Sequence, residues 1–360
     1  MDTTTNCPSD ITIHPTARGV APPPTPASAV WAAGQTLDLG FAHQMQLQQL
    51  IAQAGMGVVW QARWVNTGEA VALKTIRPDM VNKPPPVGNV SWASVIDQEF
   101  ERLLQLRSPH IVRNFHLGAV QTSNIPVLVL ERCEKSMFAT ITQLPMPPHA
   151  ALEVLRQVAS GLAALHRAGL RHLDVKPGNI LLTPAGALPA RYKLADLGAC
   201  QPQAIVQHRF AGSPGWLAPE QVQAIDQTLN SSDGQAAHAP NGANEPLYST
   251  SPATDVYALG LLLYWLITGQ NTDFAQRTQH LLTTGGEAAL RPQQANLSGA
   301  LVAADLAQFK KHCATSLDVS ALLQAFCAPS PSARPADAIV AGQQIEAVLT
   351  SSHRANRPHF

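Results

Sequence analysis

The pattern of apolar and polar residues divides the chain into a strand-rich part and a helix-rich part. After residue 45, alternating apolar positions and β-branched residues predict three strands, and these cover residues 47–51, 58–64 and 70–76. A helix is predicted next, over residues 91–106, and two further strands are predicted over residues 111–115 and 127–130. This first part is therefore expected to form a small β-rich lobe.

From residue 148 onward the pattern becomes helical. Residues 150–166 carry apolar side chains at helical spacing, and Gly169 follows as a stop signal. The apolar run 256–267, interrupted by Gly260, is too short to span a bilayer and predicts a buried helix. Short strands are expected between the helices, over residues 170–173, 180–182 and 192–195. The predicted fold class is α+β, with a larger helical lobe after the small one.

Composition sets the outer boundaries of these lobes. Residues 1–44 are rich in Thr, Pro and Ala and are predicted to be a disordered tail, with docking of a partner as the functional alternative. The lobes are assigned to residues 45–132 and 133–350, and residues 351–360 to a short C-terminal tail. A segment rich in Ser, Asn, Gly, Ala and Pro is predicted to be a loop insertion, at residues 228–254.

Charge and cysteine usage exclude several classes of protein. The formal net charge is zero and only 13% of the residues are charged, so no basic field would attract nucleic acid or an anionic membrane. The N-terminus has no basic segment followed by an apolar core, and we expect no signal peptide and no membrane span. The five cysteines form no CxxC pair, which suits a reducing cytoplasm.

The small lobe carries two features that suit phosphate binding. A glycine turn, Gly55-Met56-Gly57, would let backbone N–H groups approach a phosphate, although this segment taken alone favours a plain hairpin turn. Lys74 lies in an apolar strand and Glu99 on the apolar stripe of the following helix. Either the lysine extends to solvent from an edge strand, or the two charges pair and direct the ammonium toward phosphate oxygens.

The strongest local signal is the loop that begins at His172. It places Asp174, Lys176 and Asn179 at i, i+2 and i+5 between apolar segments. An acid, a cation and an amide so spaced suit a base for a hydroxyl, a phosphate contact and a metal ligand. Asp196 follows a strand about fifteen residues later and would suit Mg²⁺, although Asp-x-Gly alone is usually a turn.

Taken in order, these motifs resemble the eukaryotic-like (Hanks-type) bacterial serine/threonine protein kinases over about residues 45–348. The resemblance implies a bilobed fold, ATP with Mg²⁺ or Mn²⁺, and a protein substrate. It implies that Asp174 is the catalytic base and that Lys176 contacts the γ-phosphate. It further implies metal ligands at Asn179 and Asp196, and a pair of Lys74 with Glu99 at the α- and β-phosphates.

The resemblance also implies nucleotide contacts and supporting residues. The ATP-binding positions would be Ile51, Ala52, Gly55, Gly57, Val59, Ala72, Lys74, Leu130, Glu131, Cys133 and Leu181, with Leu130 as the gatekeeper. Ser213 would lie on the substrate side, which together with Asp-x-Lys-Pro-x-Asn favours Ser/Thr over Tyr. Glu220, Asp255 and Arg334 would be structural, with Arg334 pairing with Glu220.

The chain departs from the family pattern at a few positions. Ala52 and Ala54 replace glycines, which predicts weaker nucleotide binding if those positions need a positive φ. Leu173 replaces an arginine, and Leu197 replaces a phenylalanine. A pseudokinase scaffold is therefore the main alternative. A small-molecule kinase of the aminoglycoside phosphotransferase type is disfavoured, because such enzymes lack the Ala-Pro-Glu segment that contains Glu220.

The segment from Gly198 to Gly212 predicts how the enzyme is regulated. Family members often grip a phosphate on this loop with the arginine that Leu173 replaces. Residues 199–211 contain no Ser, Thr or Tyr, so activity is predicted not to depend on phosphorylation of this loop. Apolar contacts could order it instead, and any autophosphorylation is expected in the N-terminal tail or the insertion. Cys200 is expected to be inert.

Overall fold

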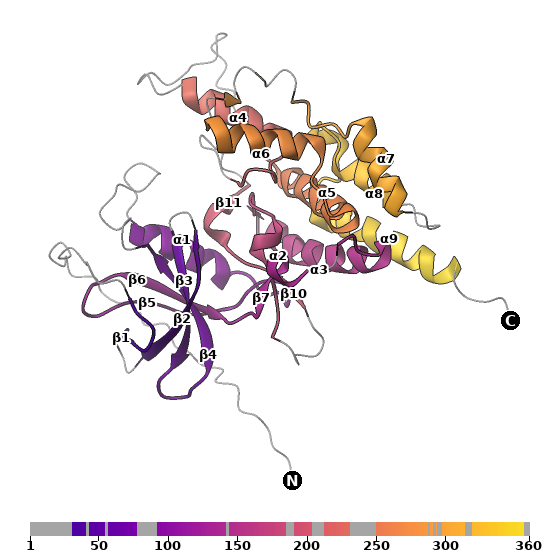
Figure 1. The fold of residues 1–360 in the computed structure, drawn as a ribbon. Helices are drawn as coiled ribbons and strands as arrows, with labels where there is room; N and C mark the ends of the chain where they lie inside the picture. The colour runs from indigo at the N-terminus through magenta and orange to yellow at the C-terminus, as the bar shows by residue number, and fades with distance from the viewer. Residues whose placement is uncertain are drawn as a thin grey trace.

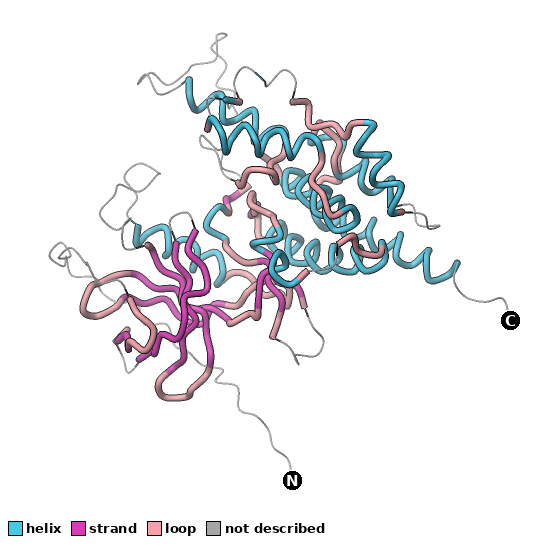
Figure 2. Tube along the Cα trace, viewed as in Figure 1, coloured by secondary structure: helices cyan, strands magenta, loops and turns pink. Residues whose placement is uncertain are grey.

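The chain folds into the two predicted lobes, a β-sheet lobe and a helical lobe (Figure 1). The computed structural model describes residues 31–40, 43–54, 57–77, 92–141, 144–184, 191–203, 212–230, 250–286, 289–290, 293, 297–313 and 319–355. Strands gather in the N-terminal lobe and helices in the C-terminal lobe (Figure 2), which confirms the α+β prediction. The predicted insertion lies mostly outside the described residues.

The N-terminal lobe is a six-stranded antiparallel sheet in the order β1-β2-β3-β4-β6-β5. Its strands are β1 (Thr36–Asp38), β2 (Gln44–Ala54), β3 (Gly57–Trp64), β4 (Ala70–Ile76), β5 (Asn114–Ala119) and β6 (Pro126–Glu131), and helix α1 (Trp92–Leu104) packs against the sheet.

Both faces of strand β4 are buried, and its alternating side chains pack into two different cores. Val71 and Leu73 belong to a core inside the sheet lobe. Ala72 and Ile76 belong to the main core, which continues into the helical lobe. Because successive side chains point to opposite faces, Lys74 lies on the same face as Ala72, toward the other lobe.

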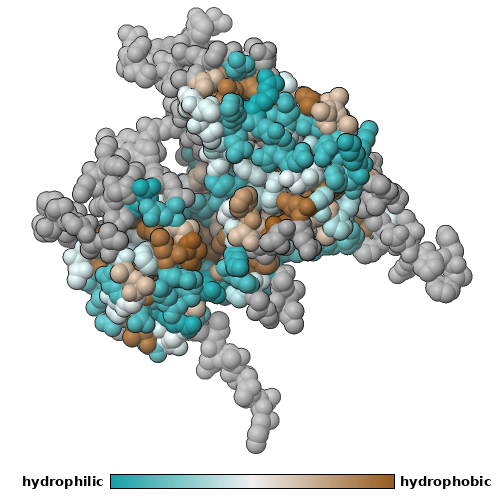
Figure 3. All heavy atoms as spheres, in the orientation of Figure 1, coloured by the Kyte–Doolittle hydropathy of each residue, from teal (hydrophilic) through white to brown (hydrophobic). Residues whose placement is uncertain are grey.

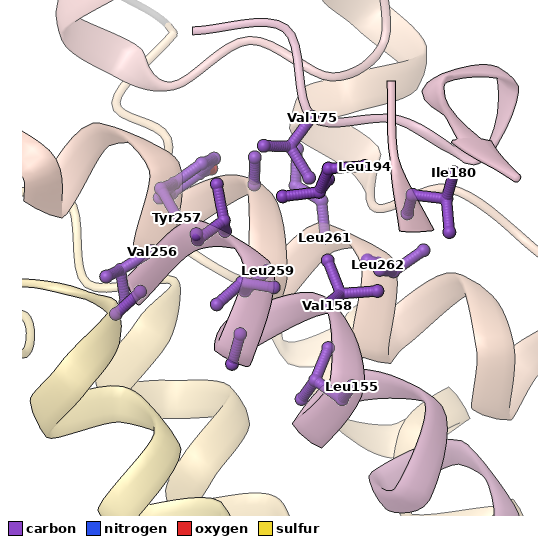
Figure 4. Close-up of a cluster of buried hydrophobic side chains, with 14 of the residues drawn as sticks. Leu155, Val158, Val175, Ile180, Leu194, Val256, Tyr257, Leu259, Leu261 and Leu262 are labelled. Carbon is purple, nitrogen blue, oxygen red and sulfur yellow. The ribbon is translucent and has the colours of Figure 1, made fainter. Parts of the chain in front are cut away.

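The C-terminal lobe is built around helix α5 (Pro252–Thr268), whose side chains from Ala253 to Thr268 are all buried. Leu155 and Val158 of α3 (Pro148–Arg167) pack among the leucines of α5, together with Ile180 and Leu194 from short strands (Figure 4). The remaining helices are α2 (Met137–Thr140), α4 (Pro219–Asn230), α6 (Asp273–Gly285), α7 (Ala303–His312), α8 (Val319–Phe326) and α9 (Ala338–Ala355).

Five short strands place the loops that face the other lobe. They are β7 (Lys135–Ser136), β8 (Leu170–Arg171), β9 (Ile180–Leu182), β10 (Tyr192–Leu194) and β11 (Gln201–Pro202). β9 pairs with β7 and β10, and β8 pairs with β11. On the face shown in Figure 3, hydrophobic patches lie beside the hollow between the two lobes.

Three predicted boundaries were wrong. The ordered chain begins before residue 45, because Trp31 and Leu37 are buried in the sheet-lobe core and β1 extends the sheet. This edge strand is only three residues long, too short to show a period, and its apolar side chain can be buried only once the sheet exists. Strand β5 begins at Asn114, while Ile111 forms only an isolated bridge to Leu194. Helix α9 continues to Ala355, since no proline follows before Pro358.

The interior glycine of α5 gives a prediction about packing. A Cβ at Gly260 would lie 2.5 Å from Cys327 Sγ and 3.0 Å from Phe326 Cβ, whereas a Cβ at Gly342 of α9 would meet nothing within 4 Å. Gly260→Ala should therefore lower the free energy of unfolding by about 1–3 kcal/mol despite its better helix propensity. Gly342→Ala, the matched control, should raise it by about 0.5–1 kcal/mol. Urea unfolding measures both, and equal effects would contradict the packing argument.

Candidate active site

The loop that carries Asp174 is hydrogen-bonded to the carboxylate of Asp255, at the start of α5. Asp255 accepts hydrogen bonds from the backbone N–H groups of His172 and Leu173, each at 2.8 Å. Leu173 has a φ of 65°, a conformation that costs energy for a residue with a Cβ. Two charge-assisted hydrogen bonds offset that cost and fix the course of the chain just before Asp174.

His166, at the end of α3, completes this support and was missed by the sequence analysis. Its Nε2 lies 2.9 Å from Asp255 Oδ2, and its Nδ1 accepts the N–H of Ala338 at 2.9 Å. Burial by itself raises the pKa of Asp255, but the contacts with His166 and His172 outweigh it and lower the pKa. The sequence offered one signal of this buried role, because His166 lies among the apolar positions of a predicted helix. His166 of α3 thus links Asp255 of α5 to the first residue of α9.

Asp174 has one carboxylate oxygen engaged and one buried without a hydrogen-bond partner. Oδ2 accepts hydrogen bonds from Lys176 Nζ and Asn179 Nδ2, each at 2.9 Å. Oδ1 is buried and has no partner in the described part of the chain. A buried acceptor of this kind is rare in native structures unless a ligand meets it. Lys176 Nζ also donates to Ser213 Oγ, so the predicted base, cation and substrate-side serine lie together.

The predicted pair of Lys74 and Glu99 is present, and it includes Asp196 as a third member. Lys74 Nζ lies 2.6 Å from Glu99 Oε2 and 2.7 Å from Asp196 Oδ1. Burial by itself lowers the pKa of Lys74, yet Asp196 and Glu99 outweigh it and raise the pKa. Lys74 lowers the pKa of Asp196 to about 2, so this carboxylate is ionised at neutral pH. One ammonium therefore joins β4, α1 and the chain after β10.

The arrangement fits a divalent cation with oxygen ligands. Asn179 donates from Nδ2 to the carbonyl and to Oδ2 of Asp174, which leaves its amide oxygen as an acceptor. The Asp196 side chain is 48% exposed, and the Asp196 backbone is left-handed, with a φ of 61°. An amide oxygen and an ionised carboxylate are the donors that Mg²⁺ prefers. Among the described residues, no cluster of three or more His, Cys, Asp or Glu forms a separate metal site.

The predicted nucleotide positions fall into two groups. Five of the eleven lie in or against the main core, and these are Val59, Ala72, Leu130 and Leu181, on strands from both lobes, and Cys133, between β6 and β7. Gly57 has no Cβ next to Lys74, where one would lie 3.8 Å from Cε. Ile51 is 47% exposed and belongs to neither core, and Gly55 lies outside the described residues.

Ala52 and Glu131 differ from what the resemblance implies for a nucleotide site. Ala52, in β2, pairs with Val59 of β3 and does not have a positive φ, so backbone strain at Ala52 is not a reason for weak binding. Glu131 uses its side chain elsewhere, because its Oε2 lies 2.8 Å from Lys193 Nζ and accepts the N–H of Arg113. Its backbone N–H also donates to the Arg113 carbonyl. The Glu131 contacts therefore tie β6 to β10 beside the predicted adenine position.

The remaining predicted residues are structural in their contacts. Arg334 pairs with Glu220 through its Nη1 and Nη2, at 2.8 and 3.0 Å, and both side chains are buried. Thr254 Oγ1 donates to the same carboxylate. Cys200 is fully buried, and burial raises the pKa of its thiol to about 12, which agrees with an inert cysteine. The loop residues 204–211, with their predicted apolar contacts, lie outside the described residues.

Comparison with known proteins agrees with this geometry. The family described as protein kinase domain matches residues 45–346. The chain belongs to the protein kinase family. The chain is 32% identical to the serine/threonine-protein kinase PknL of Mycobacterium tuberculosis over 62% of its length and 49% of that relative. It is 29% identical to the serine/threonine-protein kinase PknA of the same species over 62% of its length and 47% of that relative.

A fungal protein is similar at the same level. The cell division control protein 7 of Schizosaccharomyces pombe is 30% identical over 61% of this chain and 20% of that relative. The chain thus matches less than half the length of each of these relatives. The resemblance to Hanks-type bacterial serine/threonine kinases is confirmed as a family assignment. Protein kinases in general use ATP and a divalent metal on protein substrates. None of the described helices is both long and apolar enough to cross a bilayer.

The buried pair of Lys74 and Glu99 gives a prediction about stability. The Glu99 side chain is 2% exposed, and burial raises its pKa while Lys74 opposes that rise. Lys74→Met alone should lower the free energy of unfolding by about 3–5 kcal/mol, since it leaves a buried carboxylate without its cation. Lys74→Met with Glu99→Leu should recover most of the loss. Urea unfolding at pH 7 measures this, and a double variant no more stable than the single one would contradict it.

Proposed function

We propose that the protein is a serine/threonine protein kinase that transfers the γ-phosphate of ATP to a hydroxyl of a protein substrate. One observation carries the proposal: among the residues that the structure describes, none makes a hydrogen bond to the buried Asp174 Oδ1, while Oδ2 is held by Lys176 and Asn179. Lys74, paired with Glu99 and Asp196, supplies a cation for phosphate oxygens across the junction of the lobes. A base and a phosphate-binding cation are thus both available in one site.

In this proposal each residue has a separate task. Asn179 and Asp196 would hold Mg²⁺ or Mn²⁺, which neutralises developing charge on the phosphates when bound. Lys74 positions the α- and β-phosphates, and Lys176 contacts the γ-phosphate near the acceptor. Asp174 Oδ1 accepts the proton of the attacking hydroxyl. The new bond joins the acceptor oxygen to the γ-phosphorus, the bond from that phosphorus to the β,γ-bridging oxygen breaks, and ADP leaves.

Two alternatives are less well supported. A pseudokinase scaffold would not need Asp174, Lys176 and Asn179 to lie together, or Asp196 to pair with Lys74, as they do. A small-molecule kinase is disfavoured by the buried pair of Glu220 and Arg334, which holds the segment after Ser213. The contact of Ser213 with Lys176 supports a Ser/Thr acceptor. A cytoplasmic location and docking of a partner by the N-terminal tail remain part of the proposal.

The first test removes only the basicity of Asp174. Asp174→Asn keeps the shape of the side chain but cannot accept the proton, so kcat should fall by about 10²–10⁴-fold. The matched control is Asp273→Asn, on the half-exposed first turn of α6, which should leave kcat unchanged. Transfer from γ-labelled ATP with Mg²⁺ to the protein itself or to a generic basic protein measures this. Full activity of Asp174→Asn at an unchanged melting temperature would refute the mechanism.

We further propose that activity does not depend on phosphorylation of the activation loop. Leu173, in the position of the phosphate-gripping arginine, is an apolar and buried side chain. Residues 199–211 contain no Ser, Thr or Tyr that could accept a phosphate. Both partners of a phosphate switch are therefore missing from the sequence.

Phosphatase treatment tests this independence. Purified protein is dephosphorylated, loss of phosphate is confirmed by mass spectrometry, and the phosphatase is removed before initial rates are followed. Turnover should begin at its full rate, because no group on the loop needs to be phosphorylated first. A lag that disappears after preincubation with ATP would show that a phosphorylation switch exists.

A further inference from the structure

Arg171, the second residue of β8, is a charged side chain in an unusual position. It is 1% exposed and is the largest of the fully buried side chains in the described part of the chain. A guanidinium carries a charge and five N–H donors, and burying it is costly unless those donors meet acceptors. The acceptors that it meets therefore indicate what the residue does.

The donors of Arg171 reach two segments that are far apart in the sequence. Nη2 donates to the carbonyl of Pro202 at 2.7 Å, in β11. Nη1 donates to both the carbonyl and the hydroxyl of Thr250, immediately before the N-cap of α5. Pro202 lies at the start of the activation loop. One side chain thus joins the strand before the catalytic loop, the start of the activation loop and the start of the central helix.

The main chain alone ties this part of the loop weakly. β8 and β11 form a two-stranded ladder of two residue pairs, Arg171 with Gln201 and Leu170 with Pro202. Pro202 has no N–H to donate, and so short a pair is marginal by itself. The N–H of Gln203 adds one bond, to the Gly169 carbonyl at 2.7 Å. Among side chains, Gln203 adds a bond from Nε2 to the His166 carbonyl at 3.1 Å, and Arg171 adds the bond to the Pro202 carbonyl, which also links the segment to Thr250.

Arg171 lies two residues before Leu173, the position where the family resemblance expects an arginine. The family resemblance expects an arginine at position 173 that binds a phosphate, and here that position is apolar. The buried cation lies two residues earlier, and the acceptors described above are main-chain carbonyls and a hydroxyl. These acceptors exist in the unphosphorylated chain, so the attachment needs no prior modification.

We propose that Arg171 is a positioning residue that anchors the start of the activation loop in the unphosphorylated enzyme. The inference rests on the proposed kinase function and gives its phosphorylation independence a physical basis. The contacts of Arg171 described above are with Thr250 and Pro202, and neither residue is one of the proposed reacting groups. It acts through the loop, which returns to the catalytic residues where Ser213 meets Lys176.

The test compares Arg171→Met with Arg171→Lys in the full chain, with Arg156→Met as the matched control on the solvent side of α3, where the side chain is 41% exposed. Arg171→Met should speed amide hydrogen exchange at Gln203 and lower kcat, each by about tenfold or more, as expected for the loss of charge-assisted hydrogen bonds. The KM for ATP should change by less than about twofold, because Lys74 and its partners are untouched. Arg171→Lys should restore part of both losses.

Thr250→Val provides a milder variant that keeps the cation and removes one acceptor, and it should shift both readouts in the same direction. Wild-type kcat and Gln203 exchange in Arg171→Met would overturn the proposal. So would faster exchange throughout α3 and α5 with no rescue by lysine, since that result assigns Arg171 to global stability. If the wild-type protein transfers no phosphate, the kinase function fails, and exchange at Gln203 alone decides whether Arg171 anchors the loop.

Discussion

The buried carboxylate of Asp255 is the interaction on which the catalytic loop depends. It accepts two backbone N–H groups from the loop and a contact from His166, which in turn accepts the N–H of Ala338. A charge buried this deeply is tolerated only when its hydrogen bonds are satisfied. The hydrophobic helix α5 provides the rigid base, and the loop takes its shape, including the left-handed Leu173, from that base.

The second constraint acts between the lobes. Lys74 comes from the sheet lobe, and Asp196 from a strand end in the helical lobe. Glu99 of α1 pairs with the same ammonium group of Lys74. Since both carboxylates share one cation, the sheet, α1 and the chain after β10 are held in one arrangement. A polar cluster at the junction therefore holds the parts of the proposed nucleotide site together, while the apolar cores hold each lobe.

Loop anchoring follows a third principle, in which Nη1 and Nη2 of a buried guanidinium donate to neutral oxygens. Arg171 meets carbonyls and a hydroxyl, whereas Arg334 meets a carboxylate, and both are buried in the helical lobe. The pair of Arg334 and Glu220 holds the segment after Ser213, and Arg171 holds the segment before residue 204. The two ends of the activation loop are thus attached by separate arginines, both through permanent groups of the chain.

The sequence by itself determined the two-lobed organisation, the strands β2, β3 and β4, and the residue types at the catalytic loop, because apolar periodicity and short motifs are local properties. The pair of Lys74 and Glu99 could also be inferred, since each is a charge on an apolar face. Only the tertiary structure showed that Asp196 joins this pair and that Ile51 lies outside the core. Only it showed that His166 and Arg171 are buried supports, because their partners are up to 172 residues away in the sequence. Burial of a polar side chain depends on which distant groups surround it, and no local pattern records that.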